Sequence, residues 1–489
     1  MNKFYITTSI PYVNGEPHLG HAMEFVMADV VARYARKQGK TTLFTTGTDE
    51  HGGKIAEKAA ELKLTPQALS DQMSARFNDL ATNLNLSNDR FIRTTDKAHE
   101  QRAQLIWKAL AADIYKAKYI GWYCTGDEEF FTETQVKANN GICPDHNRPY
   151  EKLEEDNHFF RLSKHTDRIR EAIESGEFVI LPETRRNEIL ALLKEGLEDI
   201  SVSRPKDKID WGIPVPGDDA QVMYVWFEAL MNYLTVIGYP EHADFKQYWP
   251  ADVQVVGKGI TRFHAAIWPG MLLSLGLPLA KMLYVHGYVT VGSKKMSKSL
   301  GNAVSPYDVI AKYGADAFRY YFLRHIPSYD DGDFTWETFD AAYNNELANE
   351  LGNAVQRTAV MIQKYQNGII GDIPAGAHDT ARYQAALEAC HFDRALDEVW
   401  EQVRGLNQYI DEEKPWSIAK GGDADHLREV LAYQTGCLLE IADLLEPFLP
   451  ETAQKIKGIF AEGVLHPLPG TLFPKSDSPT VTRSDGQKE

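Results

Sequence analysis

The sequence has few cysteines and no long apolar run. Only four of the 489 residues are cysteine, which excludes a disulfide-stapled scaffold and favours a reducing compartment. No run reaches the roughly 18 apolar residues that a membrane-spanning helix needs. The apolar stretch near the N-terminus is interrupted by Pro11 and Asn14, which is atypical of a signal peptide. Together these absences predict a cytoplasmic protein with no membrane partner.

An excess of positive charge is also missing. The chain carries 52 Lys and Arg against 69 Asp and Glu, a net charge of −17 at pH 7, so it is not built to coat nucleic acid or an anionic membrane non-specifically. A local basic loop is still compatible with that total. Hydrophobic residues make up 43% and charged residues 25%, the ordinary balance of a globular chain. The length suggests about three domains, and there is no fixed-period repeat.

Strand and helix patterns alternate in two parts of the chain. Residues 4–10 and 41–46 are rich in β-branched and aromatic side chains and predict buried strands, with a helical apolar pattern from Met23 between them. The alternation returns at predicted strands 254–256 and 282–286. This order predicts an α/β fold with a parallel sheet, whose ligands should lie beyond the carboxyl ends of the strands.

The remaining parts of the chain have other patterns. Residues 114–211 combine two cysteines with many charges and short mixed segments, which predicts an insertion. From about residue 339 the pattern is helical throughout, which predicts a helix bundle; the helices expected are 339–366, 380–411, 424–446 and 450–461. From residue 467 the chain is rich in Pro, Ser, Asp and Thr, typical of a disordered tail.

The first candidate binding segment is His18-Leu19-Gly20-His21, at the predicted start of a helix. A helix N-terminus presents backbone N–H groups and a partial positive charge, which suit a phosphate. Gly20 allows a ligand to approach the backbone. The two histidines can donate hydrogen bonds to phosphate oxygens and can become charged near neutral pH. For so short a motif alone, capping or a solvated helix end is the more common explanation.

The second candidate segment is Lys295-Met296-Ser297-Lys298-Ser299, which follows a predicted strand of the same sheet. Flexible lysines are suitable point charges for a polyphosphate that gains negative charge as it leaves. A lone pair of lysines would more often belong to a solvated surface loop.

The two segments together resemble the signature of class I aminoacyl-tRNA synthetases, and further segments narrow the resemblance to the methionyl-tRNA synthetase family. Those segments are 9–15, 47–52, 224–229, 262–264 and 414–416. The resemblance covers about residues 3–465. It implies a Rossmann-type catalytic domain, a connective insertion with a knuckle, and an all-α anticodon-binding bundle.

The resemblance also implies an order of domains along the chain. We expect the catalytic domain in two halves, separated by the connective insertion and followed by a stem-contact region, the bundle and the tail. The expected ranges are 1–115 and 223–290 for the catalytic halves, 116–222 for the insertion, 291–340 for the K-M-S-K-S loop and stem-contact region, 341–466 for the bundle and 467–489 for the tail.

For methionine, the resemblance implies an aromatic pocket around the thioether, with Asp49 near the substrate ammonium. Contacts between sulfur and aromatic rings are favourable, although aromatic side chains are more often simple core residues. Leu230 replaces a proline of some relatives. The implied pocket consists of Ile10, Tyr12, Asp49, Trp226, Ala229, Leu230, Tyr233, Phe263, His264 and Trp268.

For ATP with Mg²⁺, the resemblance implies four catalytic side chains, His18, His21, Lys295 and Lys298, which also contact the nucleotide. It adds Gly20 and Gly257 to the ATP site. The family commonly has Gly-Lys-Asp where this chain has Gly257-Lys258-Gly259. That departure puts one contact to the ribose in doubt; one hydrogen bond contributes only about 0.5–1.5 kcal/mol, so activity need not be lost.

A zinc site is possible in the insertion. Cys124, Asp127, Cys143 and His146 resemble the family's knuckle, with an aspartate where relatives have a second cysteine. Zinc accepts all three ligand types in a four-coordinate site. A knuckle held by ordinary packing without Zn²⁺ is an equal alternative, and Cys390 and Cys437 show no ligand spacing.

For the anticodon of tRNA(Met), the resemblance implies hydrogen bonds from Asn353 and Arg357 and stacking on Trp416. Asn353 and Arg357 are four residues apart and share a helix face. A solvated helix face and a packing tryptophan are the plainer explanations.

The sequence therefore predicts a monomeric methionine–tRNA ligase that uses methionine, ATP and tRNA. Two alternatives stay open. Another class I synthetase is one, although the large aliphatic enzymes carry a longer insertion than residues 114–211. A catalytically impaired paralogue that binds tRNA is the other, and Gly259 is the feature that favours it.

Overall fold

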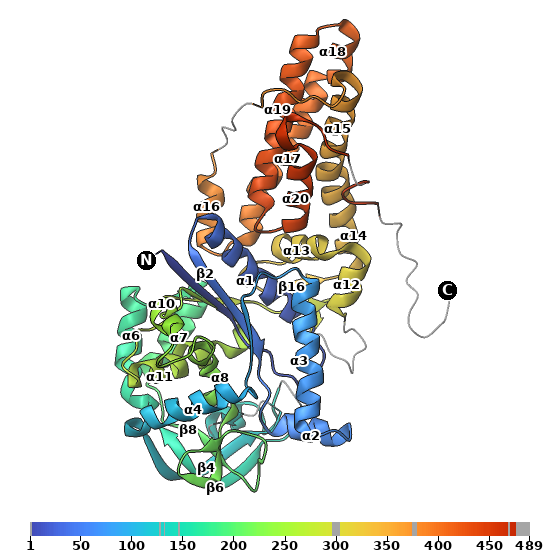
Figure 1. Cartoon of the computed structure of the whole chain (residues 1–489). Coiled ribbons are helices and arrows are strands. Elements are labelled where there is room, and N and C mark those ends of the chain that lie inside the picture. Colours follow the sequence, from blue (N-terminus) through green and yellow to red (C-terminus); the bar gives the residue numbers. More distant parts are fainter. Residues whose placement is uncertain are drawn as a thin grey trace, which may run out of the picture. The chain divides into compact units, whose positions relative to one another are not determined.

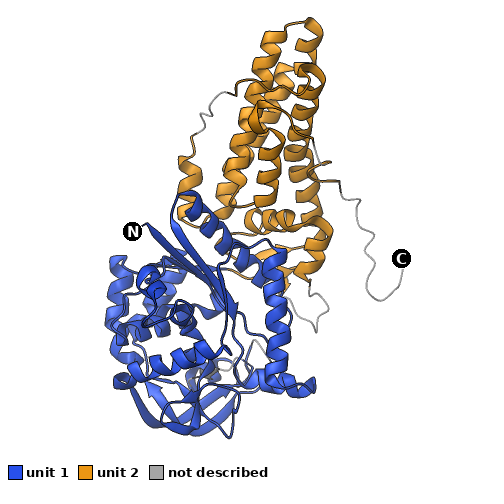
Figure 2. Ribbon diagram, in the orientation of Figure 1, with its two compact units in different colours: residues 1–286 blue, residues 287–489 orange. Residues whose placement is uncertain are grey.

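The structure is a computed structural model of the chain. It describes residues 2–126, 129–131, 133–144, 147–295, 304–373, 379–467 and 470–475, without the side chains of 129, 130 and 295. The chain divides into two compact units, residues 1–286 and 287–489 (Figure 2). Most of the tail expected at 467–489 lies outside the described residues.

The first unit is built on a six-stranded parallel sheet, which confirms the predicted α/β class. Its spatial order is β3-β2-β1-β12-β13-β7, and all five neighbouring pairs are parallel. The strand bounds are β1 Lys3–Thr8, β2 Thr41–Thr48, β3 Arg90–Arg93, β7 Val179–Leu181, β12 Val253–Gly257 and β13 Met282–His286. The strand order reverses between β1 and β12, which is where a sheet of this kind binds its ligands.

Helix α1 (Leu19–Lys37) packs on β1, β2 and β12 (Figure 1). It is buried along almost its whole length from Leu19 to Ala32, so the start of the helix is held rigidly beside the switch in strand order. The other helices of this unit that precede or follow the insertion are α2 Gly53–Glu61, α3 Pro66–Asn83, α4 Lys97–Ala109, α8 Val225–Leu230, α9 Asn232–Thr235, α10 Ala243–Tyr248 and α11 Trp268–Ser274. A π-helical segment, Phe263–Ile267, leads into α11.

The predicted insertion contains two small antiparallel sheets. The four-stranded sheet has the order β5-β4-β6-β8 and the three-stranded sheet the order β10-β11-β9. Their bounds are β4 Ile114–Cys124, β5 Glu129–Phe131, β6 Glu151–Phe160, β8 Ile200–Ser201, β9 Ser203–Pro205, β10 Pro214–Val215 and β11 Asp218–Met223. Helices α5 Glu133–Ala138, α6 Thr166–Ser175 and α7 Glu183–Glu195 accompany them.

One strand inside the range 116–222 belongs to the catalytic sheet. Strand β7 pairs in parallel with β13, with Leu283 opposite Ile180. The chain therefore returns to the main sheet between the two parts of the insertion. A three-residue strand carries too little periodicity to be recognised from sequence, because its place depends on a partner about a hundred residues away.

The second unit contains the predicted helical bundle. A three-stranded sheet comes first, β15-β14-β16, with bounds β14 Val289–Val291, β15 Lys294–Lys295 and β16 Gly332–Phe334. The helices are α12 Pro306–Tyr313, α13 Ala315–Arg324, α14 Trp336–Ala342, α15 Asn353–Gln366, α16 Ala381–Glu388, α17 Phe392–Glu413, α18 Pro415–Gly421, α19 Ala424–Leu445 and α20 Pro450–Ile459. A π-helical segment, Tyr343–Gly352, connects α14 with α15.

Helix α17 shows why these segments are helical. Its buried side chains recur at spacings of three and four, as in Leu396, Val399, Trp400 and Val403, while the intervening positions are polar. This pattern places one apolar stripe against the other helices. Within the described residues, none of the helices combines the length and apolar character needed to cross a membrane.

Candidate functional site

A small cavity lies at the switch between β1 and β12. Its volume is about 180 Å³. It is lined by Ser9, Ile10, Pro11, Tyr12, His21, Asp49, Trp226, Ala229, Leu230, Asn232, Ile260 and His264. Seven of the ten residues expected around methionine are in that set: Ile10, Tyr12, Asp49, Trp226, Ala229, Leu230 and His264. We call this space the small cavity.

The other three expected residues support the walls of the small cavity from behind. The Phe263 ring stacks on Trp226, with centroids 4.2 Å apart and planes 18° from parallel. Tyr233 packs against Trp268, which is almost completely buried, with ring centroids 5.6 Å apart. These aromatic side chains hold the lining residues in place and do not line the cavity themselves.

His264 lines the small cavity as an uncharged imidazole. Burial lowers the pKa of His264 to about 4. Its Nδ1 donates to the carbonyl of Ile260 at 3.0 Å, so in the neutral ring Nε2 is the acceptor. The hydroxyl of Tyr233 then donates to Nε2 at 2.7 Å. His264 is thereby fixed in one tautomer.

Among the described residues that line the cavity, Asp49 is the one carboxylate, and the backbone fixes its position. Its N–H donates to the carbonyl of Pro11 at 2.9 Å, and its carbonyl accepts from Val13 at 3.1 Å. These bonds form a short parallel bridge between Tyr12 and Asp49, just beyond the ends of β1 and β2. A buried carboxylate among apolar and neutral polar side chains is suited to hold an ammonium group.

The two histidines of the first motif cap helix α1. Nδ1 of His18 accepts from the N–H groups of Gly20 at 3.1 Å and His21 at 3.4 Å, while Nδ1 of His21 accepts from the N–H of His18 at 3.4 Å. The rings stack with centroids 3.6 Å apart. Capping and ligand binding are compatible here, because a neutral ring whose Nδ1 accepts carries its proton on Nε2 and can still donate from that side.

The expectation that these histidines become charged near neutral pH is wrong for this structure. Surrounding protein lowers the pKa of His18 to about 4, although part of the side chain is open to solvent. Burial lowers the pKa of His21 well below its usual value, and His18 and His286 lower it further. In the protein without a bound ligand, both rings therefore favour the neutral form, which can donate a hydrogen bond from Nε2.

Close packing against His18 gives a structural reason for glycine at position 20, in addition to the expected approach of a ligand. A Cβ at this position would lie 3.1 Å from Cε1 of His18, so the capping His18 ring would have to shift by a few tenths of an ångström to admit a larger residue. Gly257 ends β12, and a Cβ there would make ordinary contact, 3.5 Å, with the His286 ring. Both glycines lie at the switch in strand order.

Sequence reasoning missed a buried carboxylate beneath the motif. Glu24 accepts from the N–H of Ser9 at 2.8 Å, from its hydroxyl at 2.5 Å, and from Nε2 of His286 at 2.9 Å. It thus connects α1 with the ends of β1 and β13. The spacing from His21 to Glu24, one helical turn, was the available signal. The lining residues Ser9, Pro11, Asn232 and Ile260 were also missed.

The lysine motif belongs to the second unit. Lys295 ends strand β15, and its side chain, like Lys298 and residues 296–303, lies outside the described residues. The roles of Lys295 and Lys298 stay predictions.

The second unit brings together two of the three residues expected at the anticodon. The guanidinium of Arg357 lies over the Trp416 ring, 5.5 Å from its centroid, and donates to Asp411 at 2.7 Å. Asn353 begins α15 one turn before Arg357 and is exposed. The result is a partly exposed aromatic and hydrogen-bonding face, which we call the α15–α18 face.

Two of the four expected zinc ligands are described. The thiols of Cys124 and Cys143 are buried in one small cluster with Val136 and Tyr150. Asp127 and His146 lie outside the described residues, and the rest of the chain that the structure describes contains no group of three or more metal-ligating side chains. Both cysteines expected as ligands thus belong to the same cluster, and the zinc site stays a prediction.

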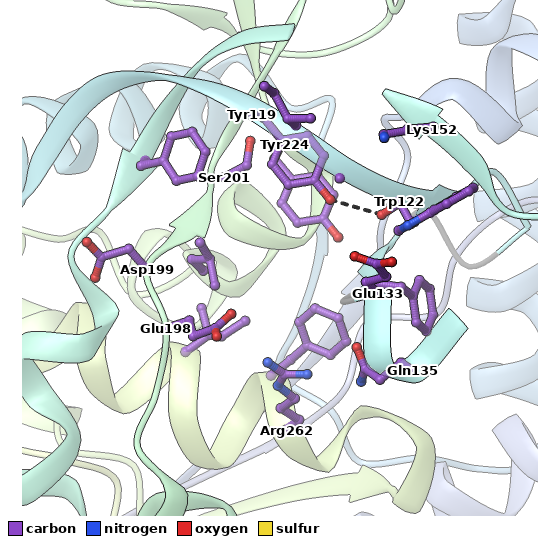
Figure 3. A pocket seen from close by; sticks show the side chains of 17 residues that line it. Tyr119, Trp122, Glu133, Gln135, Lys152, Glu198, Asp199, Ser201, Tyr224 and Arg262 are labelled. Atoms are coloured by element: carbon purple, nitrogen blue, oxygen red, sulfur yellow. Dashed lines mark hydrogen bonds between the residues drawn. The ribbon is translucent and has the colours of Figure 1, made fainter. Parts of the chain in front are cut away.

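A larger cavity, about 410 Å³, lies between the four-stranded sheet and the π-helical segment 263–267. Figure 3 shows side chains of β4, including Tyr119 and Trp122, on one side and Arg262 on the other. The hydroxyl of Tyr119 donates to the carbonyl of Trp122 at 2.9 Å. Of the expected site residues that the structure describes, only Phe263 lines this space. The Phe263 ring, which lines this larger cavity, stacks on the Trp226 ring, which lines the small cavity.

Comparisons with known proteins agree with this arrangement. The family model described as tRNA synthetases class I (M) matches residues 4–152 and 145–359. A parallel sheet with its site at the strand switch, beside a helix that starts at H-x-G-H, is the catalytic fold of a class I aminoacyl-tRNA synthetase.

Individual relatives show which family of class I synthetases the chain resembles. The methionine–tRNA ligase of Brucella melitensis is 40% identical over 477 residues, 94% of this chain and 92% of that protein. That of Bacillus subtilis is 42% identical over 482 residues, 93% of this chain and 72% of that protein. The structure of Mycobacterium tuberculosis methionyl-tRNA synthetase in complex with methionyl-adenylate superposes with a TM-score of 0.91 at 36% identity, covering 97% of this chain and 100% of that one. The chain belongs to the methionine–tRNA ligase family.

Proposed function

We propose that the chain activates methionine with ATP and transfers it to tRNA. The methionine carboxylate attacks the α-phosphate of ATP, which forms methionyl-adenylate and releases pyrophosphate. A hydroxyl of the 3′-terminal ribose of tRNA then attacks the adenylate carbonyl and releases AMP. The observation that carries this proposal is the small cavity, which is apolar apart from Asp49 and neutral polar groups and shares His21 with the H-x-G-H motif.

Methionine binding follows from the contents of the small cavity. The carboxylate of Asp49 would pair with the substrate ammonium, and the Trp226 face and Leu230 would contact the thioether. The neutral His264 offers a polar contact without adding charge. A cavity of about 180 Å³ suits a short unbranched side chain. The relative of known structure was solved with methionyl-adenylate, which supports the same occupant.

ATP binding follows from the start of α1. The Nε2–H groups of His18 and His21 and the helix N-terminus would stabilise charge that develops on the α-phosphate. Lys295 and Lys298 would hold the leaving pyrophosphate, and Mg²⁺ would accompany the triphosphate and offset its charge. Gly20 and Gly257 leave room for the nucleotide. With Gly259 in place of an aspartate, we infer that another group holds the ribose.

For tRNA, we propose that the α15–α18 face reads the anticodon. Arg357 and Asn353 would donate to base edges, and Trp416 would stack on a base. The cation of Arg357 already lies over Trp416, so the two side chains can act on neighbouring bases. In the knuckle, Cys124, Asp127, Cys143 and His146 would hold Zn²⁺ as a structural ion, with no part in the chemical steps.

Three coarser features complete the proposal. A monomer is proposed because the expected sites involve one chain. A cytoplasmic location is proposed because only four of the 489 residues are cysteine, which favours a reducing compartment. The domain bounds at 115, 222, 290, 340 and 466 are retained as proposals, with β7 assigned to the catalytic domain.

The test is ATP–pyrophosphate exchange by the purified chain with each amino acid singly and Mg²⁺ present. Exchange with methionine alone is the expected result. Exchange with a different amino acid would move the chain to another class I specificity. No exchange by well-folded protein would favour the tRNA-binding paralogue, and the Gly259→Asp variant would then show whether the missing aspartate is the cause.

A further inference from the structure

Three buried polar side chains form a hydrogen-bonded set behind one wall of the small cavity. Glu228 is completely buried in helix α8. It accepts from Nδ1 of His51 at 2.8 Å through one oxygen and from Nε2 of His99 at 2.9 Å through the other. We call these three residues the Glu228 network. None of them lines the small cavity.

The Glu228 network joins the two sides of the small cavity. His51 is two residues after Asp49, on the segment that carries the cavity's carboxylate. Glu228 lies between Trp226 and Ala229 on α8, the helix that supplies the apolar wall. The bond from His51 to Glu228 therefore sets the separation between the group for the ammonium and the group for the thioether.

His99 extends the connection to the next helix. Its Nδ1 lies 2.8 Å from the hydroxyl of Thr235 in α9. That helix begins with Asn232, a lining residue whose amide donates to the carbonyl of Ala229 at 2.7 Å. Both helices of the apolar wall are thus tied to α4, which carries His99.

A buried carboxylate is stable in this place only with its partners. Burial alone would raise the pKa of Glu228, but His51 and His99 lower it on balance. Removing one partner from such a set leaves a buried charge uncompensated, so neighbouring segments must move to restore a bond. The segments that these bonds join, the one after Asp49 and helix α8, also line the small cavity.

We propose that Glu228, with His51 and His99, positions Asp49 and the α8 wall for methionine. Glu228 is a positioning residue, because it acts through α8 and does not touch the substrate. The inference rests on the proposed methionine site. It predicts that damage to the Glu228 network raises the KM for methionine and leaves the KM for ATP unchanged, because the start of α1 is not part of the network.

The test uses pairs of variants that differ only in where an amide nitrogen is placed. The Asn amide nitrogen occupies about the position of Nδ1 of histidine, and that of Gln the position of Nε2. His51→Asn and His99→Gln therefore keep the bond to Glu228, whereas His51→Gln and His99→Asn misplace it. In pyrophosphate exchange, the methionine KM of His51→Gln should be about tenfold higher than that of His51→Asn, and the methionine KM of His99→Asn about tenfold higher than that of His99→Gln. The ATP KM should agree within about twofold in each pair.

A second pair removes the carboxylate itself. Gln at position 228 can accept from His51 and donate to His99, so Glu228→Gln should keep the methionine KM within about threefold, whereas Glu228→Leu should raise it about tenfold. If the His51 variants fail to fold, the His99 pair answers the same question, since His99 is not on the Asp49 segment.

Three results would overturn the inference: equal methionine KM within each pair, a parallel rise in both KM values, or a fall in kcat alone that follows the fraction of folded protein. Failure of the proposed function is a separate outcome, because the unmodified chain would then show no exchange with methionine at all.

Discussion

The small cavity and the α15–α18 face differ in how firmly the protein holds their polar side chains. In the small cavity, Asp49 and His264 are almost completely buried, and further layers of side chains fix them. On the α15–α18 face, Arg357 is held by Asp411, whose side chain is 66% exposed. Buried polar contacts depend on one another and are costly to break, whereas exposed ion pairs contribute about 0–1 kcal/mol each.

The difference in burial matches the difference between the two proposed ligands, a small amino acid and the bases of an RNA. A small amino acid must be distinguished by a few atoms, which requires a rigid and dry site. RNA bases arrive on a large substrate that brings many contacts, so an exposed ring and a guanidinium suffice. We therefore expect changes in the small cavity to have much larger effects than changes on the α15–α18 face.

The largest effect is expected for Asp49→Asn. The amide keeps the shape of Asp49 but removes the charge that would pair with the methionine ammonium, so kcat/KM for methionine in pyrophosphate exchange should fall about 10³-fold. Glu57→Gln, at an exposed position of α2, is the matched control and should have no effect. A loss below about tenfold would show that Asp49 does not hold the ammonium.

The next largest effect is expected for His18→Asn. Asparagine caps helices well, so α1 should keep its start, but the Nε2–H donor is lost. Adenylate formation should slow about 10²-fold, with the methionine KM little changed. Single-turnover adenylate formation measures this directly. A rise in methionine KM as large as the fall in rate would instead indicate that α1 has shifted.

A smaller effect is expected for Trp416→Ala. Loss of one stacked base should raise the KM for tRNA about tenfold or somewhat more, while pyrophosphate exchange stays intact. Tyr433→Ala removes another exposed ring of the same unit, 41% exposed in α19, and should leave tRNA charging unchanged. A fall in exchange for Trp416→Ala would mean that the unit has misfolded.

The smallest effect concerns pH and stability. His264 has its pKa lowered to about 4 by burial, so below its usual value of about 6.5 the unfolded chain takes up a proton that the folded chain does not. Its contribution to stability is therefore present above about pH 6.5 and is lost as the pH falls, by about 1 kcal/mol between pH 7 and 5.5.

Denaturant unfolding at these two pH values measures the loss, and His264→Gln should reduce the pH dependence by that amount. His426→Gln, a change at an exposed position, should leave it as it was. An unchanged pH dependence in the His264 variant would contradict the neutral state of this ring.

Much of the site could be predicted from local sequence. The position of H-x-G-H after a strand and the shared helix face of Asn353 and Arg357 are short-range features, whereas the aromatic residues at 226, 263 and 268 were implied by the family resemblance. Which of these aromatic residues line the small cavity, and which lie behind its wall, could not be predicted. Trp226 lines the small cavity while Phe263 and Trp268 lie behind or beside it, which depends on packing between segments distant in the chain.

The sequence by itself determined the α/β class, the helical bundle and the family, because periodicity and motif spacing are local properties. Only the tertiary structure decided that β7 joins the catalytic sheet, that His18, His21 and His264 are neutral, and that Glu228 accepts from His51 and His99. The last two bonds join residues 177 and 129 positions apart. Burial and long-range pairing arise only when distant segments pack together, and no local pattern records them.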